Sequence, residues 1–464
     1  MTARFRPDSL SIRELTDEEY GQVIKPGDGE YETARKVYAG DVDRKPAVIL
    51  RPRDARQVAR VVTLARRTGV QLAVRSGGHS PAGHGVCEGG IVLDLAHLRA
   101  LEIDAEARTA WAETGLTAGE YATAAAEHGL ATGFGDGTQV GIGGITLGGG
   151  IGYLCRKHGM TIDDLLAAEI VTADGELLLV DEHQHPDLFW AIRGGGGNFG
   201  VATRFKFRLH ELDAVYGGML VLPVTPEILE SFIAEAEAAP EELSTIVNVW
   251  TAPPFPFVPE EYHGKPIILA MLCYAGDADK GQEVVDRFRA IAPPLADMVQ
   301  AMPYPGMFPP ADPLEHPISV SRNMFIDRVD RATAETVLEH VSASGAMVAG
   351  AQLRVLGGAL ARVPSDATAF AHRQSRIMVL LSAIYADPAE AEVHECWADA
   401  FAAAVRQSDP GAYANFIMDA EAGQGRLRNA VYPGATGERL ARVKAKYDPE
   451  NIFRSNHNIL PATA

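Results

Sequence analysis

The sequence predicts an α+β protein of two lobes, and three observations support this. A strand–helix–strand pattern near the N-terminus leads into a glycine-rich loop, and ten glycines fall within residues 133–153. After about residue 212 the glycine density falls, and apolar strands alternate with amphipathic helices. A chain of 464 residues can form two domains, or one large domain with an inserted lobe.

The first unit begins with the apolar run Ala47–Leu50, which ends at Arg51-Pro52. Asp54 is a suitable N-cap for a helix whose apolar positions recur at helical spacing, and Gly69 is suited to end it. A short strand, residues 71–74, then enters the glycine loop, and a second apolar strand, residues 91–95, leaves it.

The loop carries four glycines within residues 74–85, beside Arg75 and His79. Glycines let backbone N–H groups turn toward a bound ligand. These N–H groups and the fixed positive charge of Arg75 both suit a pyrophosphate. The alternative for such a loop is a tight turn, and for His79 a solvated side chain. A histidine inside a phosphate-binding loop is poorly explained by packing alone.

A capping box, Thr117 to Glu120, predicts the start of an alanine-rich helix that ends near Gly129. The glycine tract at 133–153 follows, and its density argues against a packed helix or a regular strand. We expect backbone lying flat against a large ligand rather than a series of turns. No glycine match sits at a strand-to-helix junction with an acidic residue about twenty positions on, so a Rossmann site is unsupported.

In the second lobe the pattern predicts a sheet backed by helices on one side. The expected strands are 218–222, 246–250 and 266–274, and the expected helices are 226–238, 279–291 and 332–343. Proline-rich stretches carry side chains that line an apolar pocket or anchor loops: Trp250, Phe255, Phe257, Tyr304, Met307 and Phe308.

Composition excludes several function classes. A formal charge of −19 argues against nucleic acid and against anionic membranes. No apolar run reaches the length of a membrane span, and residues 1–15 carry charges throughout, unlike a secretory signal. The four cysteines lack paired spacing, so we expect no metal site, reduced thiols and a cytoplasmic protein.

Several segments resemble one family, the berberine-bridge-enzyme-like FAD-linked oxidases of the vanillyl-alcohol-oxidase superfamily, with its bacterial 6-hydroxynicotine-oxidase-like members. The resemblance covers roughly residues 45–210 and 350–460, and leaves the middle weakly matched. Its clearest motifs are the loop Arg75-Ser76-Gly77-Gly78-His79-Ser80 with Gly83, the tract 133–160, the segments 168–175 and 187–201, and the closing run 446–459.

The resemblance implies a PCMH-type FAD-binding domain of two α/β subdomains, with an inserted α+β substrate lobe whose antiparallel sheet covers the flavin. It places the FAD domain at residues 1–211, the substrate domain at 212–424 and a returning C-terminal segment at 425–464. His79 matches the histidine that bonds the 8α-methyl of the flavin. Family members with a second link carry a cysteine where this chain has Gly137, so we expect one covalent link and Cys155 as a core residue.

The same resemblance implies a set of residues along FAD. These are Arg75, Ser76, Gly77, Gly78, His79, Ser80, Gly83, His84, Thr138, Val140, Gly141, Gly144, Gly148, Gly149, Gly152, Val201, Tyr413 and Asn415.

The catalytic residues are less determined by sequence. The strand 377–385, from which some family members supply an acid or base, has no carboxylate here. We therefore expect either chemistry that needs no strong base or a tyrosine as the base, with Tyr432 first and Tyr153 second. For Tyr432, the alternative is a buried tyrosine with a satisfied hydroxyl. Val140 falls where members differ in oxygen access, and valine favours an oxidase.

The expected activity is a hydride transfer from a CH–OH or CH–NH group of a small to medium apolar or aromatic metabolite to FAD, with O2 reduced to H2O2. A carbohydrate oxidase, a dehydrogenase of the same fold and a flavin-binding protein without turnover are the alternatives. The expected partners are the small-molecule substrate and O2; a homodimer is left open.

Overall fold

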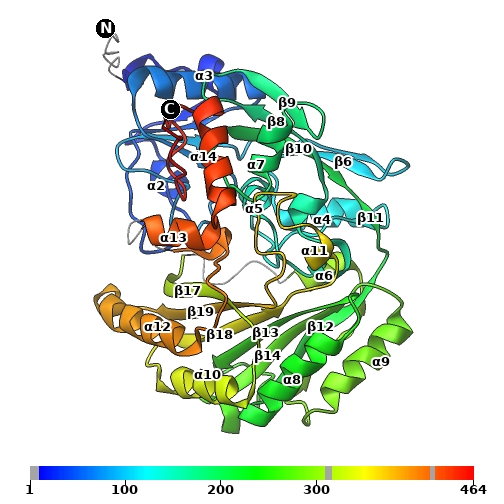
Figure 1. Ribbon diagram of the computed structural model, residues 1–464. Helices are drawn as coiled ribbons and strands as arrows, with labels where there is room; N and C mark the ends of the chain where they lie inside the picture. Colours follow the sequence, from blue (N-terminus) through cyan, green and yellow to red (C-terminus); the bar gives the residue numbers. More distant parts are fainter. Residues whose placement is uncertain (1–9, 309–315, 419–423, 464) are drawn as a thin grey trace.

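A computed structural model describes residues 10–308, 316–418 and 424–463. Figure 1 shows two lobes, with the C-terminal segment lying against the N-terminal part of the chain. The family architecture expected from the sequence is confirmed at the level of layers. In the described residues, one lobe holds a four-stranded, a five-stranded and a two-stranded sheet, and the other is one large antiparallel sheet with helices on one face.

The first sheet contains the predicted strand–helix–strand unit. Its strands are parallel except at the edge, in the order β1 (Gln22–Ile24), β2 (Val48–Arg51), β4 (Ile91–Asp94) and β3 (Leu72–Arg75). Helix α3 (Ala55–Thr68) packs on it through Val58, Val61 and Val62. Asp54 caps its start by accepting from Gln57 N, and Gly69 ends it in the left-handed region, as predicted.

The second sheet is antiparallel and carries most of the remaining N-terminal lobe. Its order is β5 (Leu101–Asp104), β6 (Thr109–Glu113), β10 (Val201–Arg208), β8 (Leu165–Val171) and β9 (Leu177–Asp181). Helix α4 (Ala118–Ala126) starts at the predicted capping box, where Thr117 and Glu120 each bond the other's backbone N–H. Helix α7 (Pro186–Ile192) and a small pair of strands, β7 (Leu130–Ala131) and β11 (His210–Glu211), complete the layer.

The glycine tract differs from the expectation. Three of its glycines lie within a seven-residue helix, α5 (Ile142–Gly148), so the expectation that the tract excludes a packed helix was wrong. Glycine costs a helix about 1 kcal/mol relative to alanine. Tertiary contacts of Ile142 and Thr146, both fully buried, offset that cost over this short length.

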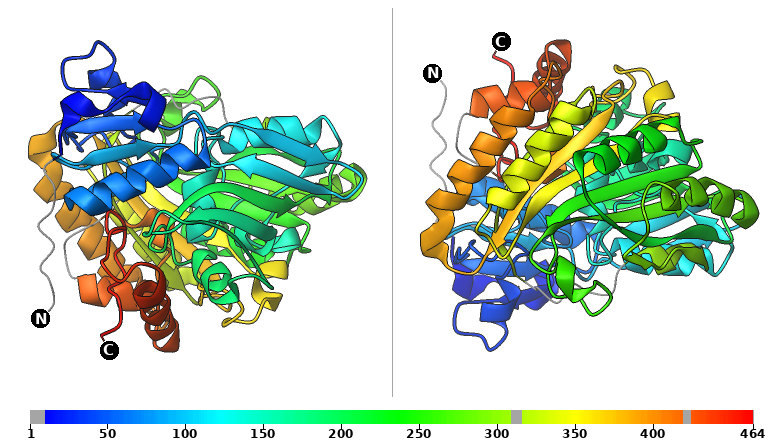
Figure 2. Two further views of the ribbon diagram at one scale, coloured as in Figure 1. Left: turned by 90° about the horizontal axis from the view of Figure 1, so that it is seen from above. Right: turned by 90° about the horizontal axis from the view of Figure 1, so that it is seen from below.

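The large sheet of the second lobe is antiparallel throughout. Its main order is β15 (Ala296–Asp297), β12 (Val215–Pro223), β14 (Pro266–Tyr274), β13 (Leu243–Thr251), β18 (Val348–Val355), β19 (Ile377–Tyr385) and β17 (Ile318–Ile326), with β16 (Gln300–Met302) beside β12. Four helices cover one face, as Figures 1 and 2 show: α8 (Pro226–Ala238), α9 (Ala278–Arg289), α10 (Arg331–Ala343) and α12 (Ala391–Val405).

The alternation of side chains assigns the two faces of this sheet. Val247, Leu353 and Val379 pack under the helices. Their neighbours in sequence point the other way, toward the N-terminal lobe. The sheet is therefore apolar on its helix side and presents a mixed polar and apolar face to the glycine tract.

Buried cations join the two lobes. Arg156, in α6 (Cys155–His158), donates to the carbonyls of Ala236 and Ala239 at the end of α8 and to that of Leu243 at the start of β13. Arg373 is fully buried and binds Asp163 with two bonds of 2.8 Å. Such contacts hold the sheet in one position over the N-terminal lobe, because breaking a buried charge pair is costly.

The C-terminal segment is tied down in the same way. In α14 (Ala435–Tyr447), Lys444 is fully buried and donates to Asp448, to Asn198 O and to Phe453 O. This anchors the tail beside the Gly194–Gly197 segment. The division of the chain at residues 211 and 424 stays a prediction, and the second boundary adjoins residues outside the described ranges.

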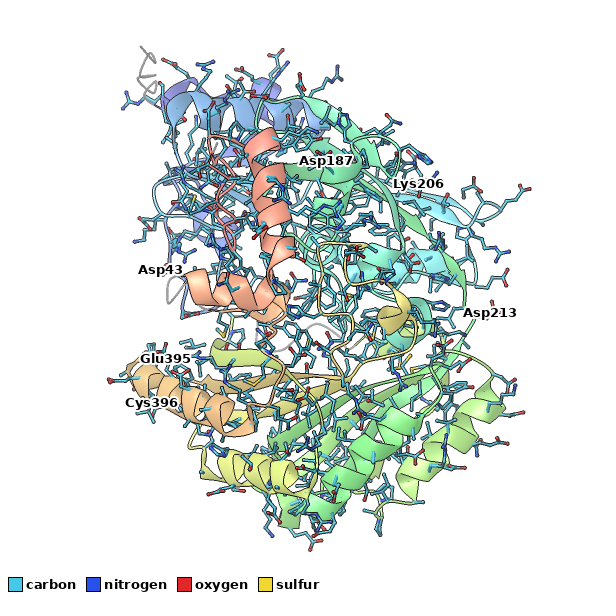
Figure 3. All side chains as sticks on the ribbon, viewed as in Figure 1. Asp43, Asp187, Lys206, Asp213, Glu395 and Cys396 are labelled. Carbon is cyan, nitrogen blue, oxygen red and sulfur yellow. The ribbon has the colours of Figure 1, made fainter. Side chains whose placement is uncertain are left out.

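All four cysteines are free. Cys87, Cys155 and Cys273 are buried, which agrees with a core role for Cys155, and Cys396 is exposed on α12 (Figure 3). Among the residues that the structure describes, no helix is long and apolar enough to cross a bilayer, and no cluster of three or more metal-ligating side chains occurs.

Candidate cofactor and substrate site

The histidine loop starts at the carboxyl edge of the parallel strands, where β3 ends. It connects β3 to β4, and β2 lies on the other side of β4. Ligands of open parallel sheets bind outside this edge. The loop is therefore at the expected place for a nucleotide cofactor.

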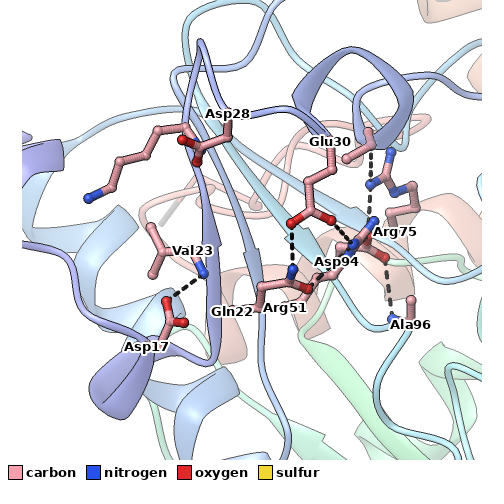
Figure 4. Close-up of polar contacts among 11 residues, drawn as sticks. Asp17, Gln22, Val23, Asp28, Glu30, Arg51, Arg75, Asp94 and Ala96 are labelled. Atoms are coloured by element: carbon pink, nitrogen blue, oxygen red, sulfur yellow. Dashed lines mark hydrogen bonds and ion pairs between the residues drawn. The ribbon is translucent and has the colours of Figure 1, made fainter.

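One carboxylate organises this edge (Figure 4). Asp94 is 3% exposed and accepts from Arg75 Nη2 at 2.8 Å and from Arg51 Nε at 2.7 Å. Burial alone would raise the pKa of Asp94, but the two guanidinium groups outweigh burial and hold this pKa below its usual value. Arg75 also donates to Ala34 O and Lys36 O. Its guanidinium thus bonds protein groups that fix the base of the loop, and its contact with a cofactor stays a prediction.

A cavity of about 370 Å³ opens beside these charges. The backbone of the loop forms one wall. Its lining residues are Glu30, Thr33, Ala34, Lys36, Arg51, Arg75, Ser76, Gly77, Gly78 and Asp94.

On its other side the loop lies backbone to backbone against the glycine tract. A Cβ at Gly77 would collide with Gly141 N, and a Cβ at Gly141 would collide with Gly77 N. The Ser76 hydroxyl donates to Thr114 O at 2.5 Å and accepts from Gly143 N at 3.2 Å. Two glycine segments more than sixty positions apart therefore form one surface.

At some glycines of this surface, no neighbouring atom would collide with an added Cβ. A Cβ at Gly144 or Gly197 would meet nothing within 4 Å, and Gly77 and Gly144 are exposed. By contrast, a Cβ at Gly148, Gly149 or Gly152 would collide with Asn415, Met160 or the carbonyl of Phe134, respectively. Exposed backbone beside a 370 Å³ cavity fits a large, flat, phosphate-bearing group such as FAD.

His79 is half-buried and its ring stacks on Tyr38, with centroids 4.8 Å apart and planes 21° apart. Further along the loop, His84 meets His457 of the C-terminal tail edge to face at 4.7 Å. Burial lowers the pKa of His84 to about 3 and that of His457 to about 4, so both imidazoles are neutral at pH 7. The C-terminal tail thus contacts the histidine loop.

Most of the other residues predicted to line the cofactor lie in the histidine loop or in the glycine tract, and Val201 lies in β10. Ser80 lies 3.4 Å from His84 Nδ1, and Gly83 (φ +66°) abuts Val42. Thr138 O and Val140 O accept from the first N–H groups of α4, while Val201 is buried in the core of the first sheet. These residues shape the loop and the tract.

Tyr413 and Asn415 lock the end of the glycine tract. The Tyr413 hydroxyl accepts from Gly150 N at 2.8 Å and from Asn415 Nδ2 at 2.9 Å. Asn415 also donates to Ile145 O in α5. Tyr413 N donates to the side chain of Asn323 in β17, so this pair links the tract to the large sheet.

The two candidate catalytic tyrosines are both buried. The Tyr432 hydroxyl lies 3.9 Å from the Cβ position of Gly196, and Tyr153 packs edge to face on Phe308 at 6.1 Å. Burial raises the pKa of both phenols, and Asp136 raises that of Tyr153 further. At neutral pH each is a protonated hydroxyl that can donate a hydrogen bond.

The structure adds a polar network that sequence reasoning missed. Arg354, 4% exposed, donates to Asp136 at 2.7 Å, to Ile151 O and to Gln352 Oε1. Because Gln352 Oε1 accepts from Arg354, its Nε2 points to Asn248 Oδ1 at 2.9 Å. The sequence signal that could have revealed this network is the pair of polar residues at positions 352 and 354, which lie on one face of an otherwise apolar strand.

These side chains lie on the sheet face that is turned toward the glycine tract. Register places Leu269 and Gln352 on either side of Asn248, and Leu380 beyond Gln352. Leu269, Gln352 and Leu380 all keep accessible surface although the sheet faces another lobe. The face combines two oriented amides with apolar neighbours.

Comparisons with known proteins agree with this geometry. The family model of the FAD binding domain matches residues 46–181, and that described as berberine and berberine like matches residues 412–460. The (R)-6-hydroxynicotine oxidase of Paenarthrobacter nicotinovorans is 29% identical over 456 residues, covering 95% of this chain and 97% of that protein.

Two solved structures are similar over nearly the whole chain. The crystal structure of 6-hydroxy-D-nicotine oxidase from Arthrobacter nicotinovorans has a TM-score of 0.84 at 26% identity and covers 100% of both chains. Glucooligosaccharide oxidase from Acremonium strictum, a protein with a 6-S-cysteinyl, 8α-N1-histidyl FAD, has a TM-score of 0.81 at 22% identity, covering 96% of this chain and 98% of that chain. At that identity, the second likeness concerns the fold alone.

Replacing Asp94 by Asn tests the carboxylate that organises the loop. We expect the free energy of unfolding to fall by about 3–5 kcal/mol at pH 7, because the buried Arg75 loses its counter-charge and the half-buried Arg51 keeps only the exposed Glu30. The folded-state pKa of Asp94 lies below the unfolded value of about 3.9. Its contribution is therefore complete above about pH 4 and is lost as the pH falls through the folded-state pKa.

The measurement is urea unfolding of both proteins over a pH series. The stability difference should shrink below about pH 4; a difference that stays constant to pH 3 would contradict this assignment. Asp43→Asn is the control, because this exposed carboxylate pairs with Arg35 at the surface (Figure 3).

Proposed function

The chain is a berberine-bridge-enzyme-like FAD-linked oxidoreductase, and on that premise we propose an oxidase whose FAD is held by a single covalent bond to His79. Its substrate is a small to medium apolar or aromatic metabolite with an oxidisable CH–OH or CH–NH group, and O2 is reduced to H2O2. One observation carries this proposal: the half-buried His79 stands at the edge of an exposed glycine surface beside a charged cavity.

Backbone groups are the main candidates to hold the cofactor. The loop Ser76–Gly78 lines the cavity, and Gly144 and Gly197 offer backbone without side-chain obstruction. When bound, FAD supplies a hydride acceptor at N5 and passes two electrons on. The protein's own part is to orient the ring, exclude water and place the substrate under the sheet.

A single covalent link is supported by the positions of the cysteines. Gly137 stands where doubly linked family members carry a cysteine. Cys155 is buried among Ile151, Met160 and Tyr413, and burial raises the pKa of its thiol. A buried protonated thiol is a poor nucleophile, so a second link through Cys155 is disfavoured.

The face of the large sheet that is turned toward the glycine tract, called the roof below, favours a largely apolar substrate with one or two hydrogen-bonding groups. Leu269 and Leu380 flank the amides of Asn248 and Gln352 on the face toward the glycine tract. Pockets with an apolar lining and few oriented polar groups are typical of small-molecule sites. A cytoplasmic location and a homodimer remain predictions from the sequence.

The covalent bond is tested by acid precipitation of the purified protein. We expect the yellow flavin to stay with the 49.7 kDa chain on a denaturing gel, because an N–C bond survives unfolding. In His79→Ala the flavin should move entirely to the supernatant while the chain still binds FAD before acid treatment. A wild-type pellet without colour would refute the covalent link. Retention of colour by His79→Ala would move the link to another residue.

The reaction class is tested by a substrate screen that records peroxide. Apolar or aromatic amines and alcohols should release H2O2 at least about tenfold faster than sugars, since one extra buried methylene contributes about 1–3 kcal/mol of discrimination. An artificial dye serves as a second acceptor. Dye reduction without peroxide would indicate a dehydrogenase, and a preference for oligosaccharides would indicate a carbohydrate oxidase.

The role of Tyr432 is tested once a substrate is known. Tyr432→Phe should slow anaerobic bleaching of the flavin by about 10²-fold or more, the usual contribution of a proton-transferring group. Tyr153→Phe is the matched comparison, since it removes the other buried hydroxyl. Unchanged bleaching in Tyr432→Phe would remove that residue from the reaction.

A further inference from the structure

The segment 34–40 forms a strap across the histidine loop. Ala34 O and Lys36 O accept from the guanidinium of Arg75, at 2.6 and 3.2 Å. Tyr38 N donates to Gly78 O at 3.0 Å, directly beside His79. The Arg75 side chain and the Gly78 carbonyl thus hold the strap to the part of the loop that directly precedes the histidine.

The far end of the strap is tied to the second lobe. His316 Nδ1 donates to Val37 O at 2.7 Å, and Gly40 N donates to Pro317 O at 3.0 Å. A Cβ at Gly40 would collide with His316 O, so this approach requires glycine. The strap therefore lies between the loop and the start of β17, with little freedom to shift.

Tyr38 is the strap residue that meets His79. Its ring covers one face of the imidazole at a centroid distance of 4.8 Å. Face stacking fixes the plane of the imidazole but leaves its edge, where both nitrogens lie, outside the contact. The backbone N–H of Tyr38 donates to Gly78 O, and this bond places the tyrosine ring in a defined position relative to the loop.

From this geometry we propose that Tyr38 is a positioning residue for covalent flavin attachment: its stacked ring holds the His79 imidazole in the plane from which a ring nitrogen meets the flavin. The inference rests on the covalent link proposed above. Attachment replaces one C–H bond of the 8α-methyl group and one imidazole N–H bond by a single C–N bond. Two protons and two electrons are released and reduce O2 to H2O2.

The size of the effect follows from the strength of such contacts. An aromatic pair contributes about 0.5–1.5 kcal/mol beyond its buried area, which corresponds to about a twofold to tenfold change in rate. Loss of the ring should therefore slow attachment without abolishing it. The hydroxyl has no part in the stacking, so a phenylalanine should serve equally well.

The experiment compares Tyr38→Leu and Tyr38→Phe with the wild type in samples taken at intervals during expression in aerated cells, before attachment is complete. Three quantities are followed: the fraction of flavin that stays with the acid-precipitated chain over time, the total flavin bound before acid treatment, and Tm. Tyr38→Leu should attach flavin about two- to tenfold more slowly while binding the same total amount. Tyr38→Phe should match the wild type.

Tyr31→Phe is the matched control in the preceding helix, α2 (Tyr31–Ala34). Its hydroxyl donates to Pro46 O at 2.6 Å, so this variant should lower Tm and leave the attachment rate unchanged. A wild-type rate in Tyr38→Leu overturns the proposal, and so does a loss of total bound flavin in parallel with attachment. Slow attachment in Tyr38→Phe would also overturn it, by assigning the effect to the hydroxyl.

Refutation of the covalent link itself would give a different result from refutation of the role of Tyr38. If the wild type itself retains no flavin after acid treatment, the covalent link is refuted together with the role of Tyr38. If the wild type retains flavin and Tyr38→Leu does so at the same rate, only the role of Tyr38 is lost.

Discussion

The neutralisation of two arginines by one buried carboxylate holds the functional edge of this molecule together. Asp94 ends β4, and its partners Arg51 and Arg75 end the two strands beside it. The loop between β3 and β4 is rich in glycine, which lowers steric barriers but makes ordering more costly in entropy. Arg75 offsets that cost by joining the base of the loop to Asp94 and to the strap. A histidine on this loop can therefore keep a defined position.

A second set of buried cations fixes the large sheet relative to the glycine tract of the N-terminal lobe. Arg354 reaches from β18 to Asp136 and Ile151 O, while Arg156 and Arg373 bond groups across the two lobes or along their seam. Each guanidinium has several acceptors, so displacement of the sheet would leave charges unpaired at low dielectric. The amide of Gln352 takes its orientation from this frame. The proposed substrate face and the contacts that dock the two lobes thus share residues.

Local sequence signals predicted much of the fold. The caps of α3 and α4, and the bounds of α8 and β14, follow from side chains within one turn or from simple periodicity. The glycine tract was harder, because α5 forms against local propensity under tertiary packing. The bond between Arg75 and Asp94 could not be predicted locally, because the carboxylate lies nineteen positions away in another strand. Gly148 and Gly149 proved to be packed against Asn415 and Met160, a contact that spacing does not reveal.

The sequence alone determined the family resemblance, the histidine motif, the expected cofactor and the alternation of strands and helices, because these depend on residue types at short, regular intervals. Only the tertiary structure decided which glycines face open space, which aromatic ring meets His79 and which amides line the roof. Those outcomes depend on segments such as 34–40, 141–144, 248–354 and 413–415 meeting in space. Long-range contacts of this kind arise from the packing of whole elements, and no local pattern encodes them.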